Sequence, residues 1–424
     1  MTLLLLGTFT LLFIFGWPVV IAVMLPAIAY VLWNDFPLEL VGQRMVYALD
    51  SFPLVAVPIF IFVGSLMNQS GITERIYTFS SACVGRIHGG LAQVNIFASL
   101  VFSGMSGAAL ADIGGLGRIE VKAMTAHGFK KEFASALTCA SAIVGPIFPP
   151  SIPLIIYGSV TNVSIVQLLI AGIVPALVCV VFLMITVAIL AWKYDFPRAE
   201  RWPTRQELSS SFLSALPALL TPILMVGGML VGWFTPTEAA SITVVYVIFI
   251  SVVIYRSLTW QHLLASAYET IKSTAAILVI VSAAALFGWI LAVEGIPQAA
   301  AKELLSLSKD PLVLLLIVNV LLLIVGMFLD STTATLLVIP IIAGPLHMAG
   351  VDPIHLGIVA IFNLMLGLFT PPMGLALFLI ADIAKVSIRS VLKEMLPLYI
   401  PLVGTLIVLI LFPEITLWLP KMMR

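Results

Sequence analysis

The sequence predicts an all-α polytopic membrane protein built from two inverted repeats, and three features of the chain support this fold class. First, 61% of the 424 residues are hydrophobic and 9% are charged, whereas soluble domains carry about 25% charged residues. Second, apolar runs long enough to cross a bilayer recur along the whole chain, without the alternation of barrel strands. Third, a motif from the first half returns in the second half. These features exclude a soluble domain and a β-barrel.

The first half is predicted to cross the membrane five times. We interpret the apolar run at 2–15 as a membrane helix and not as a signal peptide, because no basic segment precedes it and a second apolar run follows at once. The expected crossings are 2–15, 17–33, 52–68, a broken helix at 132–160, and 165–193. Segment 90–124 is apolar but interrupted by small and polar residues, which predicts a hairpin that enters and leaves on one side.

The second half repeats this order within residues 206–424, after a first repeat at 1–205. Its expected crossings are 212–234, 235–255, 273–293, a broken helix at 354–383, and 395–413, and its hairpin is expected at 312–346. The chain therefore has 10–11 crossings and two re-entrant hairpins. Because each half crosses an odd number of times, the two halves have opposite orientations, as in many secondary transporters.

A Gly-x-x-x-Pro-Pro motif carries the evidence for the duplication. Each of its positions recurs 222 residues later, together with a Gly-Met pair 45 residues before the Pro-Pro. The corresponding positions are Gly145 with Gly367, Pro149 with Pro371, Pro150 with Pro372, and Gly104 with Gly326. Repetition in the same order at one offset indicates a true internal repeat.

The distribution of charge agrees with this topology. The net charge is zero, so a nucleic-acid partner has no support. If the N-terminus faces outward, all but five of the 20 Lys and Arg residues fall on the cytoplasmic side, as the positive-inside rule requires. The five exceptions are Arg44, Lys302, Lys309, Lys421 and Arg424.

The two Pro-Pro breaks are candidate ion sites. Proline donates no backbone hydrogen bond, so each break frees carbonyl groups that need partners in lipid. Neighbouring helices and water can satisfy them, which gives a structural kink, or a cation can do so. Two symmetric breaks, each paired with a polar hairpin tip, favour Na⁺ sites.

Each predicted Na⁺ site is an uncharged cage of backbone and hydroxyl oxygens that needs no carboxylate. The first site is expected to use Ser103, Ser106, Val144, Gly145 and Pro149. The second site is expected to use Gly326, Gly367, Thr370 and Met373.

Asp330 is the most informative single residue, because a carboxylate in the middle of a membrane costs about 2.5–3.5 kcal/mol on insertion scales. It lies at the tip of the second hairpin, between apolar runs. We expect it to contact substrate or support an ion, and the alternative is a cap of the following helix. In contrast, Thr235 and Glu238 have the spacing of a capping box, so we interpret them as structural.

An enzyme is not expected. Ser106 lies in a Gly-x-Ser-Gly pattern like that around the nucleophile of intramembrane serine proteases, but such a nucleophile needs a base. All five histidines fall in loops or at helix ends, and no metal-binding or phosphate-binding motif is present.

Together these motifs resemble one transporter family over essentially the whole chain. They are residues 103–107, 145–150, 232–240 and 367–372. The chain is similar to the large permease subunit (M subunit, DctM-like) of tripartite ATP-independent periplasmic (TRAP) transporters, and most similar to the sialic-acid type. The resemblance implies an elevator mechanism, in which a transport domain of hairpins and broken helices moves past a scaffold made of the remaining helices. Interfacial segments at 72–88 and 256–272 belong to that scaffold.

The resemblance also implies ligands, partners and a location. Na⁺ is the coupling ion, at the positions given above, and no other cofactor is implied. The partners are a small four-helix Q subunit, a periplasmic binding protein P and a carboxylate-bearing solute, in the inner membrane of a bacterium. Since no additional helices precede residue 2, Q is expected as a separate chain. Ser151 joins Asp330 and Ser106 as a candidate substrate contact.

The substrate is expected to be sialic acid (N-acetylneuraminate), with a C4-dicarboxylate or another sugar acid as alternatives. A carboxylate at Asp330 repels a dicarboxylate, whereas the hydroxyl and amide groups of a sugar acid can donate to it. A stand-alone divalent-anion sodium symporter shares the inverted hairpins, but such carriers usually have Ser-Asn-Thr at both tips. A membrane scaffold without transport activity has no use for polar breaks deep in the membrane.

Overall fold

The computed structural model describes residues 2–197 and 201–422, and the described part consists of helices and connecting turns without a strand. Arg424, which the charge distribution assigned to the outer side, lies outside the described residues. The predicted helical class is confirmed.

The described residues of the first repeat form twelve α-helices and one short 3-10 turn. Its elements are α1 (Thr2–Ile14), α2 (Val19–Trp33), α3 (Glu39–Leu49), η1 (Phe52–Val55), α4 (Ala56–Gln69), α5 (Ile72–Val84), α6 (Leu91–Ser106), α7 (Ala109–Gly114), α8 (Leu116–Ala126), α9 (Lys131–Ala142), α10 (Ile152–Thr161), α11 (Ile165–Ala171) and α12 (Ile173–Tyr194). The helices α6, α7 and α8 form the first hairpin, and α9 and α10 are the two halves of the first broken helix.

The second repeat follows the same plan. Its elements are α13 (Arg205–Leu230), α14 (Pro236–Phe249), η2 (Ile250–Ile254), α15 (Trp260–Val293), α16 (Ile296–Leu307), α17 (Pro311–Phe328), α18 (Ser331–Met348), α19 (Pro353–Leu368), α20 (Leu375–Ala384), α21 (Ile388–Leu411) and α22 (Glu414–Lys421). Here α17 and α18 form the hairpin, while α19 and α20 are the halves of the broken helix. Both predicted hairpins and both predicted breaks are therefore present.

Eight segments of the described chain are long and apolar enough to cross a membrane. Two of them, α17 and α18, are the arms of the second hairpin. The other six correspond to six of the ten predicted crossings. The remaining four predicted crossings are the two broken helices and the shorter helices α1 and α2. With 13 and 15 residues, α1 and α2 reach only about 20 Å, which is less than the roughly 30 Å of a hydrocarbon core.

Three details differ from the prediction. Residues 256–272 were expected to lie at the interface, apart from a crossing at 273–293, but α15 runs without interruption through 34 residues. The linker before η1 contains a helix, α3, that hydropathy alone did not indicate. The returning arm of the first hairpin is divided at Gly115 into α7 and α8, whereas α18 is continuous. Polar and charged residues in α3 and in the first turns of α15 hid these helices from a search for long apolar runs.

Local sequence explains where several helices begin. Thr235 accepts a hydrogen bond from the Glu238 backbone while the Glu238 side chain bonds back to the Thr235 backbone, so the predicted capping box is confirmed. A second capping box of the same type, Thr204 with Glu207, begins α13. Each such cap is worth about 1 kcal/mol to its helix.

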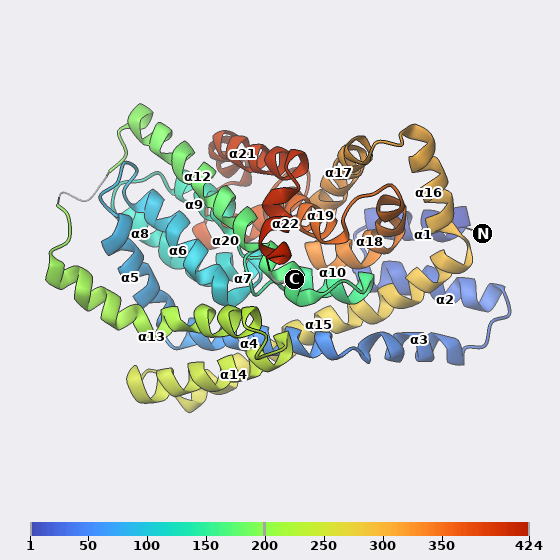
Figure 1. Ribbon diagram of the computed structural model, residues 1–424, viewed down its shortest axis with the longest axis horizontal. Coiled ribbons are helices and arrows are strands. Elements are labelled where there is room, and N and C mark those ends of the chain that lie inside the picture. Colours follow the sequence, from blue (N-terminus) through green and yellow to red (C-terminus); the bar gives the residue numbers. More distant parts are fainter. Residues whose placement is uncertain (1, 198–200, 423–424) are drawn as a thin grey trace.

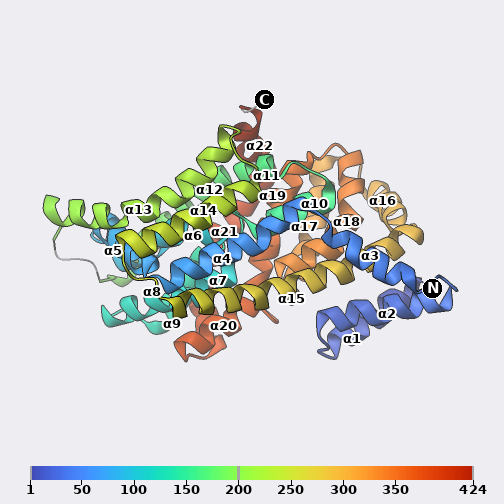
Figure 2. The ribbon, with the colours of Figure 1, turned by 90° about the horizontal axis from the view of Figure 1, so that it is seen from below.

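The two repeats interlock through their broken helices. α10 of the first repeat packs on hairpin helix α18 of the second, and α20 of the second repeat packs on α7 of the first. The elements α3, α4, α14 and α15 run along one edge of the molecule, with the hairpins and broken helices beside them (Figure 1). Seen from below, α15 and α4 lie along the same diagonal (Figure 2), and these two helices pack against each other.

Candidate functional site

Each hairpin tip is joined to the break of its own repeat by one backbone hydrogen bond. The Ile152 amide donates to the Gly107 carbonyl at 3.2 Å, and the Gly374 amide donates to the Met327 carbonyl at 3.2 Å. Ile152 and Gly374 are equivalent positions, 222 residues apart. The peptide bonds Pro149–Pro150 and Pro371–Pro372 are both cis. The predicted pairing of tip and break is therefore present in both repeats.

Asp112 changes the interpretation of the first predicted Na⁺ site. The Ser106 hydroxyl donates to Asp112 Oδ1, and Asp112 is only 3% exposed. Its other oxygen, Oδ2, has no hydrogen-bond partner among the described residues, and a Cβ added at Gly145 would collide with it. The site was predicted to be an uncharged cage, whereas here the α7 turn carries a carboxylate back between Ser106 and Gly145.

The other residues predicted for the first site surround this carboxylate less directly. The Ser103 hydroxyl donates to the Leu100 carbonyl of its own helix at 2.7 Å. The Val144 carbonyl accepts from the Phe148 amide at 2.9 Å, and Pro149 is buried. In the described part of the chain, the side-chain oxygen of this site without a hydrogen-bond partner is Asp112 Oδ2, which lies beside Gly145.

The second predicted site is a close contact between two backbones. A Cβ at Gly367 would lie 2.6 Å from the Gly326 carbonyl carbon, so α17 and α19 touch without side chains between them. The Thr370 hydroxyl donates to the Leu366 carbonyl at 2.7 Å, and the Met373 side chain is 50% exposed. The described residues contain no group of three or more His, Cys, Asp or Glu that could hold a metal ion, so the candidate ligands are hydroxyl, carbonyl and single carboxylate oxygens.

The two hairpin tips meet at one central cavity of about 630 Å³, within the range of small-molecule sites. Ser106 and residues 108–111 contribute from the first tip, and residues 330–332 contribute from the second. α4 and α15 form the opposite wall, with Ser65, Asn68, Glu269 and Ser273. Inverted repeats thus bring positions more than 200 residues apart to one site.

Asp330 caps α18 and also lies on the cavity wall. Its Oδ2 accepts from the Thr332 amide at 2.9 Å and from the Thr333 amide at 3.2 Å, and its Oδ1 accepts from the Thr333 hydroxyl. The side chain is half-buried and borders the central cavity. The two interpretations of Asp330 are therefore compatible, because a carboxylate held as a cap presents a fixed charge to the cavity.

Ser151 does not reach the cavity. Its hydroxyl is fully buried, donates to the Pro146 carbonyl and accepts from the Leu154 amide at 3.2 Å, which makes it the N-cap of α10. Its neighbours Ile152 and Pro153 line the cavity instead. In this conformation Ser151 supports the break from behind the cavity wall.

Arg118 and Glu269 are the charged cavity residues that sequence reasoning missed. Arg118 is the one basic side chain among those that line the cavity, and the sequence had placed it only in a cytoplasmic loop. Glu269 accepts from the Ser65 hydroxyl at 2.6 Å, which joins α15 to α4. The available signal was the position of Arg118 in the sequence. It lies three residues after Gly115, where the hairpin arm is divided.

A buried polar network holds the first hairpin to its broken helix. Glu120 of α8 accepts from Asn95 at 2.9 Å and from Thr138 at 3.1 Å, and Ser141 donates to Asn95 at 2.8 Å. In the second repeat, Asn363 donates to Asn319 Oδ1 at 2.6 Å. Both repeats therefore connect the first hairpin arm to the broken helix through an asparagine.

Known proteins resemble this chain along nearly its whole length. Residues 6–415 match the family of the tripartite ATP-independent periplasmic transporter DctM component. The chain belongs to this family. It is 42% identical to the sialic acid TRAP transporter large permease protein SiaM of Vibrio cholerae, over 96% of the chain and 98% of that protein.

Two further relatives and one solved structure extend the comparison. The chain is 39% identical to the sialic acid TRAP transporter permease protein SiaT of Haemophilus influenzae, over 96% of the chain and 66% of SiaT. It is 33% identical to the 2,3-diketo-L-gulonate large permease protein YiaN of Escherichia coli, over 94% of each. The YdaH transporter of Alcanivorax borkumensis shares the fold, with a TM-score of 0.65 and 17% identity over 90% of each chain.

Membership in the DctM family makes this chain a multi-pass permease subunit of a TRAP transporter in the bacterial inner membrane and not an enzyme. The geometry agrees, because the Ser106 hydroxyl is bonded to a carboxylate and not to a histidine.

Proposed function

We propose that this subunit imports a carboxylate-bearing solute together with Na⁺, and that the solute is N-acetylneuraminate. The observation that carries the proposal is the central cavity, where both hairpin tips meet and where Arg118 and Asp330 both line the wall. Arg118 can pair with the carboxylate of a sugar acid, while Asp330 accepts from its hydroxyl or amide groups. The two sialic acid permeases among the relatives support the choice of substrate.

Na⁺ coupling rests on Asp112. A buried carboxylate oxygen without a partner is costly, and a cation would relieve this cost. The oxygens of Asp112, Ser106 and the first break suit Na⁺, since hard cations prefer oxygen ligands. At the second break, carbonyl oxygens and the hydroxyl of Thr370 would serve a second ion. Binding at the two breaks would hold both hairpin tips in the conformation that closes around the solute.

The interlocked hairpins and broken helices support an elevator mechanism. In this mechanism they move as one transport domain against a scaffold that includes α4 and α15, because the cavity lies between these two groups. We further propose that the small subunit is a separate four-helix chain that binds the scaffold, and that the periplasmic protein delivers the solute. The term "large permease" in the names of two relatives supports the small partner.

Uptake by the reconstituted complex tests this proposal. The chain is purified with its small subunit and placed in liposomes, and radiolabelled N-acetylneuraminate is added with the periplasmic binding protein. We expect uptake only with an inward Na⁺ gradient and with the binding protein present, and excess unlabelled succinate should not compete. Uptake without the binding protein would indicate a stand-alone symporter, and uptake without Na⁺ would overturn the coupling.

A further inference from the structure

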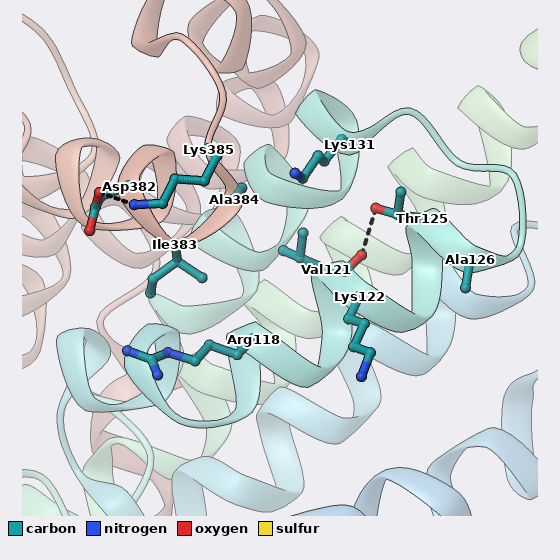
Figure 3. Close-up of a pocket in the computed structure, with 10 residues that line it drawn as sticks. All are labelled: Arg118, Val121, Lys122, Thr125, Ala126, Lys131, Asp382, Ile383, Ala384 and Lys385. Carbon is teal, nitrogen blue, oxygen red and sulfur yellow. Dashed lines mark hydrogen bonds and ion pairs between the residues drawn. The ribbon is translucent and has the colours of Figure 1, made fainter.

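A basic groove lies beside the central cavity, between α8 and the end of α20 (Figure 3). Its volume is about 700 Å³. Four basic residues from both repeats line it: Arg118, Lys122, Lys131 and Lys385. The inverted topology thus brings a turn of the second repeat next to the hairpin of the first. The charge distribution along the sequence assigned all four residues to the cytoplasmic side.

The charges of the groove are not neutralised within the described part of the chain. Its single acidic residue, Asp382, is paired with Lys385 at 2.7 Å. Arg118, Lys122 and Lys131 form no ion pair within 4 Å. The groove therefore carries an excess of three positive charges, and such a surface concentrates anions.

The spacing of the two basic residues on α8 does not stabilise the helix. Arg118 and Lys122 are four residues apart, so their side chains lie on one face together with Val121 and Thr125. Like charges at this spacing destabilise a helix slightly. Because no acidic side chain of the described residues forms an ion pair with Lys122, a ligand explains the two charges better than folding does.

Arg118 belongs to the wall of the groove and also to the wall of the central cavity. The other charged residues of the cavity, Glu269 and Asp330, are acidic. An anion that leaves the cavity towards the groove thus stays within reach of a guanidinium group along the way. A guanidinium can bind a carboxylate through two parallel hydrogen bonds, and Lys122 and Lys131 add donors further along.

We propose that this groove is a second anion site, which receives the carboxylate of the solute on the release side of the central cavity. Arg118 is the residue common to both sites, so the carboxylate changes partners without ever being unpaired in a region of low dielectric constant. The proposal rests on the function proposed above, and it adds a specificity element: a neutral sugar gains nothing from the groove.

Binding and uptake by three variants test the proposal. Lys122→Gln/Lys131→Gln removes two charges that line the groove but not the central cavity. Lys130→Gln is the matched control, because Lys130 adjoins Lys131 in sequence, is 78% exposed, and faces Glu394 at 3.8 Å outside the groove. Lys122→Arg/Lys131→Arg keeps the charge and tests for rescue. Gel filtration of each purified complex verifies that it is folded.

Equilibrium binding of radiolabelled N-acetylneuraminate is measured in detergent at low ionic strength, where the Debye length is about 30 Å. We expect the double Gln variant to bind about tenfold more weakly, which is the low end of the effect of a focused field. Choline chloride, added at constant Na⁺, should reduce the difference. Initial uptake by the reconstituted double Gln variant should fall by a similar factor, while the Na⁺ concentration for half-maximal uptake stays unchanged.

Equal binding by the double Gln variant and the wild type would overturn the proposal, and so would an equal loss in Lys130→Gln. A phosphate of an anionic lipid is the other source of the same chemistry. If the uptake defect appears only in liposomes that contain anionic lipid, and detergent binding is normal, the groove holds lipid and not solute. Wild-type uptake without Na⁺ dependence would contradict the proposed coupling. If binding is still lost in the double Gln variant, the proposed anion site is nevertheless supported.

Discussion

Pro149 and Pro150 are buried, whereas their counterparts Pro371 and Pro372 in the second repeat are exposed. The two hairpin–break units share the backbone hydrogen bond from tip to break and the cis Pro–Pro bond. They differ in what fills the space between tip and break. In the first unit this is the carboxylate of Asp112, and in the second it is the bare contact of Gly326 with Gly367.

This difference shows what a duplication preserves. The repeated glycines and prolines fix the backbone, because they set where a helix must end and how closely two chains can approach. The side chains between them are free to change. One unit can therefore acquire a buried charge while the other stays neutral and tightly packed. Variants at the two breaks distinguish these two designs.

Gly367→Ala is expected to have the largest effect. The new Cβ would lie 2.6 Å from the Gly326 carbonyl carbon and 2.9 Å from the Leu323 carbonyl oxygen, and neither backbone can move without shifting α17 from α19. We expect a loss of about 3 kcal/mol or more, at the upper end for overpacking. Thermal unfolding of the purified protein, followed by gel filtration, measures it.

Gly145→Ala makes the sharper comparison, since its Cβ meets the Asp112 side chain, which can rotate away. It should reduce stability less than Gly367→Ala but weaken the response of uptake to Na⁺. Gly288→Ala is the control, because no atom lies within 4 Å of its Cβ. Equal thermal stability of the two variants in the breaks would contradict the distinction between a side-chain contact and a backbone contact.

Asp112→Asn is expected to weaken Na⁺ coupling in the first unit. The amide keeps the size of the carboxylate but removes the charge, so the affinity for a cation falls. Loss of a charged hydrogen bond costs about 1.5–3 kcal/mol, which corresponds to at least a tenfold higher Na⁺ requirement. The uptake rate as a function of Na⁺ concentration measures it. An unchanged Na⁺ dependence would reduce Asp112 to a partner of the Ser106 hydroxyl.

Asp330 requires two variants, because the same carboxylate caps a helix and borders the cavity. Asp330→Ala removes both roles and should abolish uptake, with a loss of about 1 kcal/mol in stability from the cap. Asp330→Asn keeps a capping oxygen and removes only the charge. If Asp330→Asn transports normally while Asp330→Ala does not, the residue acts as a cap and its charge is not used by the solute.

Asn363→Ala is expected to have the smallest effect of these changes, yet a larger one than Ser141→Ala. Asn363 supplies the side-chain link from α19 to Asn319, and such bonds in membranes average about 0.6 kcal/mol. Ser141 shares its task with Thr138 and Glu120, which also bind Asn95. A melting-temperature shift that is larger for Ser141→Ala would refute this ranking.

Sequence reasoning found the backbone plan because the plan is encoded locally. A Pro-Pro pair ends a helix wherever it occurs, and the capping box at Thr235 needs only four residues. The hairpin tips and breaks were therefore located correctly. α3 and the continuous α15 escaped detection because polar residues interrupt their hydropathy. Packing stabilises them as helices, since α15 packs against α2, α3 and α4, and α3 packs against α15.

The composition of the site was harder to predict because it depends on distant contacts. Asp112 lies six residues after Ser106 in the sequence, and the α7 turn brings its carboxylate back to Ser106 and Gly145. The sequence indicates only a basic residue in a loop at Arg118. Its role depends on the fold, which places Asp382 and Lys385 of the other repeat in the same groove. Ser151 is adjacent to the break in sequence, but the direction of its side chain follows from the cap of α10, which takes its hydroxyl away from the cavity.

The length of α15 has a consequence for the surrounding lipid. A helix of 34 residues is about 51 Å long, while the hydrocarbon core is about 30 Å thick. The excess must be accommodated by tilt, by emergence into the headgroups, or by local thickening of the bilayer. Since α15 forms one wall of the central cavity, a change in membrane thickness that alters the tilt of α15 also changes the shape of the cavity. The rate of transport should therefore depend on the acyl-chain length of the lipid.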